Sequence, residues 1–334
     1  MNPDHNRVPT IEDVRAAQQR CNGKVLTTPL LESPLLNKQI GKRLLIKAEC
    51  LQITGAFKFR GAWSALSSLT QEQLDRGVLA YSSGNHAQAI AYAAALHHTR
   101  ATIIMPNDAP ALKRTNTEAY GAEVVLYDRP GGEDREAIGQ ELAKQRGCTL
   151  IKPYDNTQVI SGQGTCGLEL AQQLAERRIE KADVLVCCGG GGLTAGITLA
   201  LEADAPGITV RPVEPVNYDD VARSIASGKR ESVVDYQPSI CDAIVTPSPG
   251  ELTFPIIKRS CGAGLVVSDD EALQAIAVAQ HHFKLVAEPG GAVALAATLF
   301  RQNEILADTI VCVVSGGNVA PDILTRALSR VSSI

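Results

Sequence analysis

Short apolar runs recur along this chain of 334 residues, and each is followed by a turn of Gly, Asn or Pro and then by a stretch rich in Ala and Leu. Many of these runs are apolar at every position, which is typical of strands buried on both faces of a parallel sheet. The pattern predicts strands over residues 43–49, 77–83, 101–106, 122–128, 149–154, 183–189, 209–214, 265–269 and 309–316.

Helices are predicted between these strands. The sequences Thr10-Ile-Glu-Asp13 and Ser268-Asp-Asp-Glu271 have the form of capping boxes that open two of the helices. Strands that alternate with helices predict an α/β protein with open sheets. Because the chain exceeds the usual size of a single hydrophobic core, two domains or lobes are expected.

Charge and composition exclude some functions. The formal net charge is -4 and no basic run occurs, so we expect no nucleic-acid partner. The adjacent cations at 113–114 and 177–178 are interpreted as solvated helix faces, and RPGGEDRE (129–136) as a turn followed by an exposed helix start.

The N-terminus is polar, and no apolar run approaches the length of a membrane span, so we expect neither a signal peptide nor a membrane partner. The nine cysteines include no CxxC pair, and several lie in apolar segments. We interpret them as buried, reduced thiols of a cytoplasmic protein.

Ligands of open α/β sheets bind at the carboxyl ends of strands, and two strand ends here carry polar or Gly-rich turns. After Tyr81, the sequence SSGNH predicts a helix that begins near Asn85 or His86, with exposed N–H groups suited to a carboxylate. An ordinary helix cap remains an alternative there. The four consecutive glycines Gly189, Gly190, Gly191 and Gly192 lack every Cβ, which favours a phosphate-binding loop.

The glycine loop also fits a different cofactor. Gly190-x-Gly192-x-x-Ala195 matches a dinucleotide fingerprint, and Glu214 follows about 20 residues later, where a ribose ligand belongs. An NAD-dependent oxidoreductase is therefore an alternative, although it leaves the other strand ends and Lys58 unexplained.

Lys58 lies between two phenylalanines in TGAFKFRGAW (54–63), in a chain with only 5 Phe. Apolar surroundings lower the pKa of a lysine and make it a nucleophile or base. The alternative is a lysine whose stem merely packs at the start of a helix. With a third strand end at Ser315, the chain offers an amine, two anion cradles and a hydroxyl. Pyridoxal phosphate needs such a set: a lysine, a phosphate site and a partner for its ring nitrogen.

In this order, Glu49, TGAFKFRGA, SSGNHA, CGGGG and VSGGN resemble the fold-type II pyridoxal-phosphate enzymes, and most of all the serine/threonine dehydratases and serine racemases. The resemblance extends from about Pro9 to the C-terminus. It implies a fold like that of the tryptophan synthase β chain, with two open-sheet lobes and the cofactor in the cleft between them. The larger lobe would comprise 1–70 and 158–334, the small mobile lobe 71–157, and the enzyme would be a homodimer.

The resemblance also implies roles for residues of this chain. Lys58 would bind the cofactor as a Schiff base, Phe57 would pack near the ring, and Asn85 would hydrogen-bond the ring hydroxyl. Gly189 to Gly192 would hold the phosphate. Ser315 would face the ring nitrogen, and a neutral hydroxyl there favours elimination over transamination.

The substrate and a metal ion are placed by the same resemblance. The loop of Ser82, Ser83, Gly84, Asn85 and His86 would bind the substrate carboxylate, with Ser83 on the face opposite Lys58. The sequence VEPVNYDD matches a divalent-cation site, which implies that Glu214, the carbonyl of Tyr218 and Asp220 bind Mg²⁺ or another divalent cation.

We therefore expect an ammonia-lyase in which Lys58 removes the α-proton of a small-molecule amino acid, the β-hydroxyl leaves, and a 2-oxo acid and ammonia are released. L-Threonine and L-serine are the first expected substrates, and 3-hydroxyaspartate is the second. Serine racemisation, with Ser83 returning a proton, is a further alternative. Arg60 would be the nearest cation in sequence for a second substrate carboxylate, but its position relative to Lys58 does not establish that it faces the site. Ala56 and Ala87 depart from residues common in the family and lie near the expected substrate.

Overall fold

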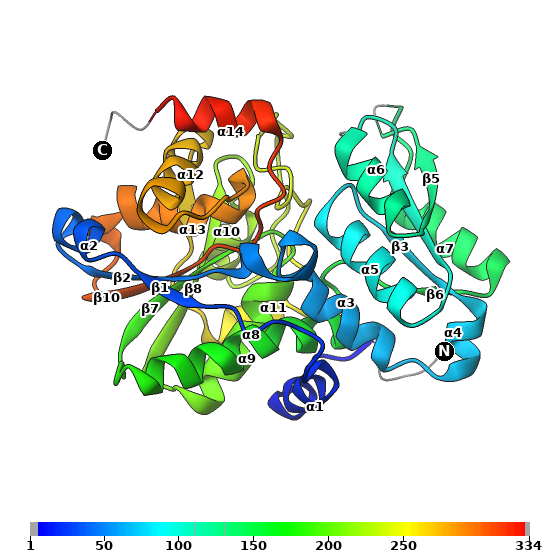
Figure 1. Cartoon of the computed structure of the whole chain (residues 1–334), viewed down its shortest axis with the longest axis horizontal. Coiled ribbons are helices and arrows are strands. Elements are labelled where there is room, and N and C mark those ends of the chain that lie inside the picture. Colours follow the sequence, from blue (N-terminus) through cyan, green and yellow to red (C-terminus); the bar gives the residue numbers. More distant parts are fainter. Residues whose placement is uncertain (1–5, 110, 130, 331–334) are drawn as a thin grey trace.

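The computed structural model describes residues 6–109, 111–129 and 131–330, which form two α/β lobes side by side (Figure 1). The strands are β1 Leu30–Glu32, β2 Arg43–Lys47, β3 Val78–Tyr81, β4 Ala101–Pro106, β5 Glu123–Tyr127, β6 Thr149–Leu150, β7 Ala182–Cys187, β8 Ile208–Pro215, β9 Leu265–Val267 and β10 Thr309–Val313. The helices are α1 Ile11–Cys21, α2 Pro34–Ile40, α3 Lys58–Ser67, α4 Gln71–Arg76, α5 Asn85–Leu96, α6 Ala111–Ala119, α7 Arg135–Arg146, α8 Thr157–Glu176, α9 Gly192–Asp204, α10 Asp220–Ser227, α11 Phe254–Ser260, α12 Asp269–Phe283, α13 Pro289–Phe300 and α14 Pro321–Leu328. Short 3₁₀ helices are η2 Glu49–Leu51, η3 Ile53–Gly55 and η4 Gln302–Glu304.

The larger sheet has the strand order β1-β2-β10-β7-β8-β9. Strands β2, β10, β7, β8 and β9 are parallel, and β1 joins the edge of the sheet antiparallel to β2. The inner strands are almost completely buried, in accord with their continuous apolar sequences. Strand β10, which is the last in sequence, lies in the interior of the sheet between β2 and β7.

The smaller sheet has the order β5-β4-β3-β6, and its strands are all parallel. These strands fall within 71–157, the segment predicted as a small lobe. The mobility of that lobe and its boundaries stay predictions, and residues 1–5 and 331–334 of the predicted larger lobe lie outside the described residues.

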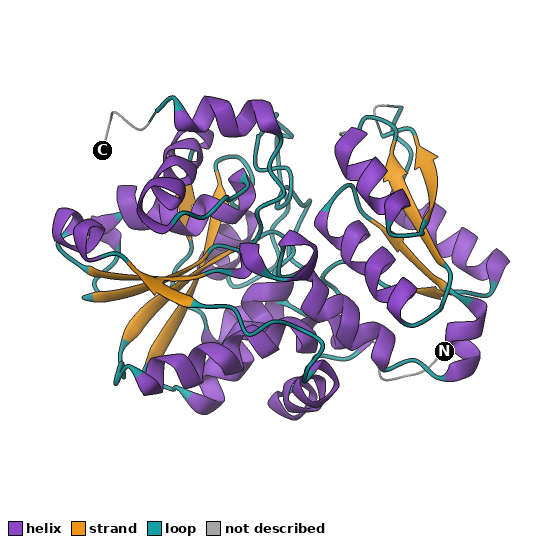
Figure 2. Cartoon of the chain, in the orientation of Figure 1, coloured by secondary structure: helices purple, strands orange, loops and turns teal. Residues whose placement is uncertain are grey.

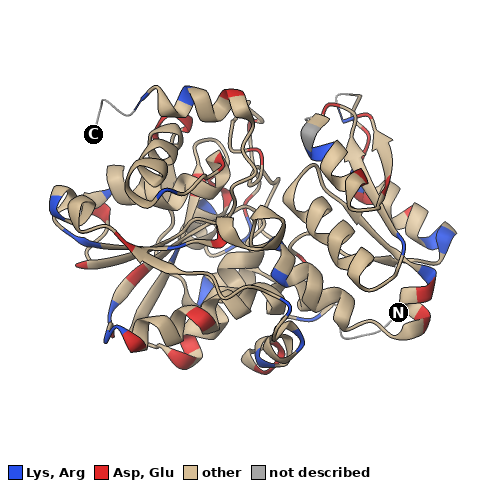
Figure 3. Ribbon diagram, in the orientation of Figure 1, with Lys and Arg blue, Asp and Glu red and all other residues tan. Residues whose placement is uncertain are grey.

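Helix α3 links the two lobes. It packs against α8 on the larger side and against α5 on the smaller side. Loops gather between the two sheets, where Figure 2 shows the helices and strands giving way to irregular chain. Charged residues of both signs are interspersed over the outer helices of both lobes (Figure 3). Among the described residues, none of the helices is both long enough and apolar enough to span a membrane.

The α/β class and all the predicted strands are confirmed, but two details differ. Strand β1 was not predicted, because three residues are too few to show a period. The run 149–154 is a strand only at Thr149–Leu150, and the rest, interrupted by Pro153, forms a loop toward the space between the lobes. The predicted capping boxes are present: the Ser268 N–H donates to Glu271 at 2.7 Å, and the Thr10 N–H donates to Asp13 at 2.8 Å.

Candidate active site

A cavity of about 920 Å³, including its open mouth, lies between the two lobes. The strand-end segments predicted from the sequence meet in its walls, which are formed in part by Phe57, Lys58, Ser82, Ser83, Gly84, Asn85, His86, Gly189, Gly190, Gly191, Gly192 and Ser315. Segments far apart in the chain are therefore brought to one place by the carboxyl ends of two parallel sheets.

Lys58 is the first residue of α3, and its side chain is part-buried in the cavity wall. Its Nζ donates to the carbonyl of Pro153 at 2.9 Å and lies 5.0 Å from the centre of the Phe57 ring. Burial lowers the pKa of Lys58 to about 8. The apolar setting noted in the sequence thus has the expected effect, and a much larger share of the amine is neutral and nucleophilic at physiological pH than in an ordinary lysine.

The glycine loop connects β7 to α9 and is packed too tightly for larger residues. A Cβ on Gly190 would lie 2.3 Å from the ring of Tyr154, and Gly191 has φ 87°, in the left-handed region. The first main-chain N–H groups of α9 have no partner within the helix, and they directly follow this loop. The arrangement can therefore bind an anion such as phosphate.

Helix α5 begins at Asn85, as predicted, so its first N–H groups have no partner within the helix. The side chain of His86 is buried, and its Nε2 lies 3.2 Å from the carbonyl of Ile151, which can only accept. Burial lowers the pKa of His86 to about 3, so the ring is neutral. A carboxylate bound here would therefore meet main-chain N–H groups, and not a histidinium.

Ser315 and Asn85 lie on the wall near α13. The Phe57 N–H donates to the Ser315 carbonyl at 3.0 Å, which joins the lysine segment to the last strand end. Asn85 Nδ2 donates to Glu288 Oε1 at 2.5 Å. Glu288 was not predicted from the sequence; the signal available was its place before Pro-Gly-Gly, as the N-cap of α13. Burial raises the pKa of Glu288 to about 7, and its Oε2 has no hydrogen-bond partner among the described residues.

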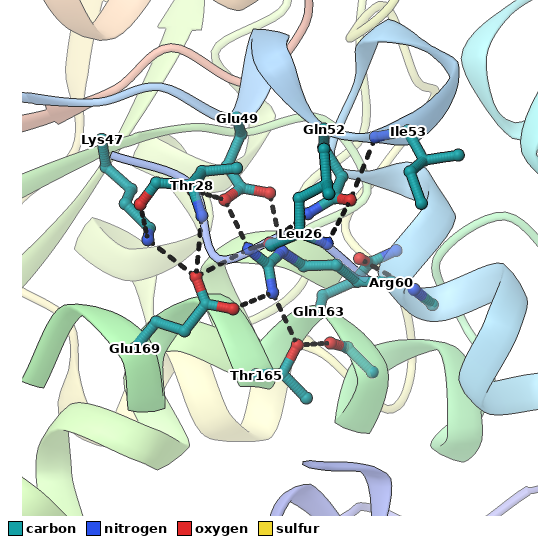
Figure 4. Close-up of polar contacts among 12 residues, drawn as sticks. Leu26, Thr28, Lys47, Glu49, Gln52, Ile53, Arg60, Gln163, Thr165 and Glu169 are labelled. Atoms are coloured by element: carbon teal, nitrogen blue, oxygen red, sulfur yellow. Dashed lines mark hydrogen bonds and ion pairs between the residues drawn. The ribbon is translucent and has the colours of Figure 1, made fainter. Parts of the chain in front are cut away.

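Arg60 does not face the cavity, which corrects its candidacy as a substrate ligand. Figure 4 shows it in a buried cluster, the Arg60 cluster, formed by Arg60, Glu49, Glu169 and Lys47 with neighbouring polar groups. Its guanidinium donates to both carboxylate oxygens of Glu49, at 2.7 and 2.8 Å, and to both of Glu169, at 2.7 and 2.8 Å. Glu49, the first of the residues that carry the family resemblance, thus helps to hold Arg60 and helix α3 in position.

Two other cations line the cavity, and neither was expected there. Lys113 was interpreted as part of a solvated helix face, but it is mostly buried and pairs with Asp242 at 2.5 Å. Arg135, expected on an exposed helix start, lies over the Tyr81 ring at 5.5 Å and has no carboxylate within ion-pair distance among the described residues. The helices α6 and α7 carry these side chains, and only the packing of the lobes places them at the cavity.

The predicted cation-site residues Glu214, Tyr218 and Asp220 lie together at the end of β8 and the start of α10. Both carboxylate oxygens of Glu214 accept main-chain N–H groups of α10, at 2.9 and 2.7 Å. Burial raises the pKa of Asp220 to about 7, and its Oδ2 is buried without a partner among the described residues. No group of three or more His, Cys, Asp or Glu side chains in the described part of the chain is arranged to hold a metal.

The alternative of a dinucleotide site is not supported. Glu214, which would have to bind a ribose hydroxyl, is fully buried and does not line the cavity beside the glycine loop. The chemical groups of the cavity instead fit pyridoxal phosphate: a desolvated amine, a glycine cradle for an anion, and the hydroxyl of Ser315, which is 4% exposed.

Comparison with known proteins agrees with this fit. Residues 22–316 match the family model described as pyridoxal-phosphate dependent enzyme. The chain is 42% identical over 313 residues to L-threo-3-hydroxyaspartate ammonia-lyase of Saccharomyces cerevisiae, covering 93% of this chain and 94% of that protein. It is 37% identical over 324 residues to serine racemase of Dictyostelium discoideum, covering 96% and 98%. Among solved structures, maize serine racemase matches with a TM-score of 0.89 and 35% identity, covering 97% of this chain and 98% of that one.

Proposed function

Because this chain belongs to the pyridoxal-phosphate dependent enzymes, we propose that it is an ammonia-lyase that converts a β-hydroxy amino acid into a 2-oxo acid and ammonia. The observation that carries the proposal is the meeting of Lys58, the N-terminus of α5, the glycine loop and Ser315 in one cavity. Its relatives include ammonia-lyases, and the oxidoreductase alternative lacks its expected ribose ligand in the cavity, because Glu214 does not line it.

We assign the cofactor-holding roles as the sequence predicted. Lys58 would hold the cofactor covalently, Phe57 would contact its ring, and Asn85 would bind the ring oxygen. The four glycines of the loop would hold the phosphate, and Ser315 would face the ring nitrogen. These roles are supported by the shared cavity and by the steric closeness of the loop to Tyr154.

When bound, pyridoxal phosphate withdraws electrons from the α-carbon of an attached amino acid and makes its proton acidic. The start of α5 would hold the substrate carboxylate through main-chain N–H groups. The Lys58 amine, whose pKa burial lowers to about 8, would accept the α-proton at Nζ once the substrate amine has replaced it on the cofactor. The β-hydroxyl leaves with a proton as water, and hydrolysis consumes one water and releases ammonia. Ser83 lies in the same cavity wall and is the candidate proton donor if racemisation accompanies elimination.

The cations in the cavity lining favour 3-hydroxyaspartate over L-threonine or L-serine, which reverses the order expected from the sequence. Arg135 is a cation without a carboxylate partner among the described residues, and Lys113, which pairs with Asp242, also lines the cavity. A second substrate carboxylate would supply the charge that Arg135 lacks. The yeast relative named for 3-hydroxyaspartate supports the same choice.

The test is to assay purified protein with L-threo-3-hydroxyaspartate, L-threonine and L-serine, measuring 2-oxo acid and the D-isomer separately. We expect Arg135→Ala to lower kcat/KM for 3-hydroxyaspartate by about a hundredfold, since a charge pair between the part-buried Arg135 and the substrate would be lost, and to change L-threonine turnover little. Arg129→Ala, which removes an exposed cation paired with Asp108, is the matched control. A wild type that prefers L-threonine, or forms D-serine in place of an oxo acid, would contradict this substrate.

We also propose that Glu214, Asp220 and the carbonyl of Tyr218 bind a divalent cation such as Mg²⁺. Two buried carboxyl groups with raised pKa values, and the free Oδ2 of Asp220, support a missing positive charge at this place. Mg²⁺ or Ca²⁺ should raise the Tm of the wild type, and Asp220→Asn should abolish that rise. Asp219→Asn, at the neighbouring part-buried carboxylate that already pairs with Arg223, is the control.

A cytoplasmic location and a homodimer remain proposals. The nine cysteines are all free, which is consistent with a reducing compartment. Sedimentation of the purified protein tests the dimer.

A further inference from the structure

Two side chains without a role assigned from the sequence, Asn318 and Glu288, are joined through Asn85 by hydrogen bonds that lead into the cavity. Asn318 Nδ2 donates to the Thr54 carbonyl at 2.8 Å and to Asn85 Oδ1 at 2.8 Å. Asn85 Nδ2 in turn donates to Glu288 Oε1 at 2.5 Å. Asn318 belongs to the VSGGN motif and Thr54 to the TGAFK motif, yet neither received a role from the sequence.

The chemistry of the hydrogen-bond partners determines which end of each amide donates and which end accepts. A main-chain carbonyl can only accept, so Asn318 must present its nitrogen to Thr54. The second hydrogen of that nitrogen then requires an oxygen from Asn85, and the Asn85 nitrogen is left to face Glu288. An asparagine whose two ends could otherwise exchange is thereby held in one orientation.

The segment of Thr54 and Gly55, on which Asn318 is held, is itself closely packed. Thr54 has φ 62°, in the left-handed region, and Gly55 follows with φ 73°. A Cβ on Gly55 would lie 2.6 Å from Asn318 Oδ1, and the Gly317 N–H donates to the Gly55 carbonyl at 2.9 Å. The segments before Lys58 and after Ser315 are therefore joined at short range, and Asn318 is held where it can reach Asn85.

We propose that Asn318 and Glu288 are positioning residues that hold the Asn85 amide with its second N–H available to the cavity, so that the ring oxygen of pyridoxal phosphate must be bound as an acceptor. Asn85 Nδ2 carries two hydrogens and uses one on Glu288. Both Asn85 and Glu288 line the cavity, and each is at most 9% exposed. This inference rests on the proposed function, because it concerns the same cofactor.

The orientation matters because the two ends of the amide have opposite effects on a ring oxygen. An N–H donor stabilises the ionised oxygen, whereas an amide oxygen at the same position would repel it. Turning one side chain over would thus change the absorption of the bound cofactor and its affinity without removing any residue that touches it.

The experiment compares variants that change the residues hydrogen-bonded to Asn85 but leave Asn85 itself unchanged. In Asn318→Asp, an ionised carboxylate can no longer donate, so the Asn85 nitrogen should turn toward residue 318. In Glu288→Leu the acceptor is lost, and in Glu288→Gln an oxygen that can accept is kept. Asn37→Asp is the matched control, because Asn37 is also part-buried and makes two side-chain hydrogen bonds, far from the cavity, with Glu32 and the Leu44 N–H.

The readouts are the pyridoxal phosphate dissociation constant of cofactor-depleted protein and the visible absorption of the bound cofactor across a pH titration. We expect Asn318→Asp and Glu288→Leu each to weaken binding about tenfold, the loss of roughly one hydrogen bond to a charged group, and to shift the absorption in the same direction. Glu288→Gln and Asn37→Asp should stay close to the wild type. The double variant Asn318→Asp/Glu288→Leu should be no worse than either single variant, because both act on one amide.

An Asn318→Asp protein with the absorption and affinity of the wild type would overturn the inference. So would a Glu288→Gln protein as weak as Glu288→Leu, since charge and not orientation would then decide binding. A wild-type protein that bound no pyridoxal phosphate would instead overturn the proposed function.

Discussion

The two cations at the start of α3 have opposite surroundings. Lys58 and Arg60 are two residues apart, which places their side chains about 200° apart around the helix. Every nitrogen of Arg60 donates to an acceptor in the Arg60 cluster, and although burial opposes it, the facing carboxylates hold the pKa of Arg60 well above its usual range. Lys58 has one carbonyl partner and a pKa lowered to about 8.

This contrast teaches how to separate support from chemistry in a buried polar site. The Arg60 cluster balances two cations against two carboxylates and leaves none of the Arg60 donors free, so it can only hold its geometry. The cavity around Lys58 contains an amine with a lowered pKa and, among the described residues, a buried Glu288 carboxyl oxygen without a hydrogen-bond partner and an Arg135 cation without a carboxylate. A bound ligand can supply the hydrogen-bond and charge partners that such groups lack.

Removing Lys58 should have the largest effect. We expect Lys58→Ala to lower turnover by at least about a thousandfold, because both the nucleophile and the proton acceptor are lost. The visible absorption of the lysine-bound cofactor should disappear while the circular dichroism spectrum and Tm change little. Substantial oxo-acid release by this variant would show that another base performs the reaction.

Breaking the Arg60 cluster should lower the stability of the fold and should not act directly on the reaction. We expect Arg60→Met to lower the free energy of unfolding by about 3–5 kcal/mol, because Glu49 and Glu169 would be left buried without their partner. Arg43→Ala, which breaks a half-exposed pair with Glu32, should cost about 1 kcal/mol or less. Urea unfolding of the two variants and the wild type measures these differences in unfolding free energy. Equal losses would mean that burial of the cluster contributes nothing.

The charge of Lys58 can be followed by pH. In cofactor-depleted protein, the rate of covalent attachment of pyridoxal phosphate should fall about tenfold per pH unit below pH 8 and level off above it, because only the neutral amine attacks. Glu288 titrates near pH 7 in the same cavity, whereas His86 stays neutral, so a Glu288→Gln protein serves as control. A rate that kept rising to pH 10 would place Lys58 at its ordinary pKa.

Neutralising one carboxylate of the Arg60 cluster should have the smallest effect. Glu169→Gln keeps an oxygen for Arg60 but removes one negative charge, at a side chain that is 15% exposed. We expect a loss of about 1–2 kcal/mol in unfolding free energy and unchanged cofactor absorption. A spectral change in this variant would show that the two faces of α3 are coupled.

The sequence predicted the parts of the site that follow directly from strands. Lys58, the α5 N-terminus, the glycine loop and Ser315 are local signals, because each lies at a strand end or helix start. Arg135, Lys113 and Asp242 could not be placed in this way. They come from helices and loops with ordinary polar patterns, and they meet only after the two lobes pack. Glu288 was visible only as a carboxylate before a Pro-Gly-Gly helix start, which by itself is a common cap.

The interior position of β10 has a consequence for the chain as it is synthesised. The smaller sheet is complete once residue 150 has been made, since its strands are consecutive in sequence. The larger sheet must wait: β2 and β7 each present an open edge until Thr309–Val313 arrives to pair with both. We therefore expect nascent or truncated chains that end before β10 to have one complete sheet and one incomplete sheet with exposed strand edges, and to aggregate readily until β10 has been made.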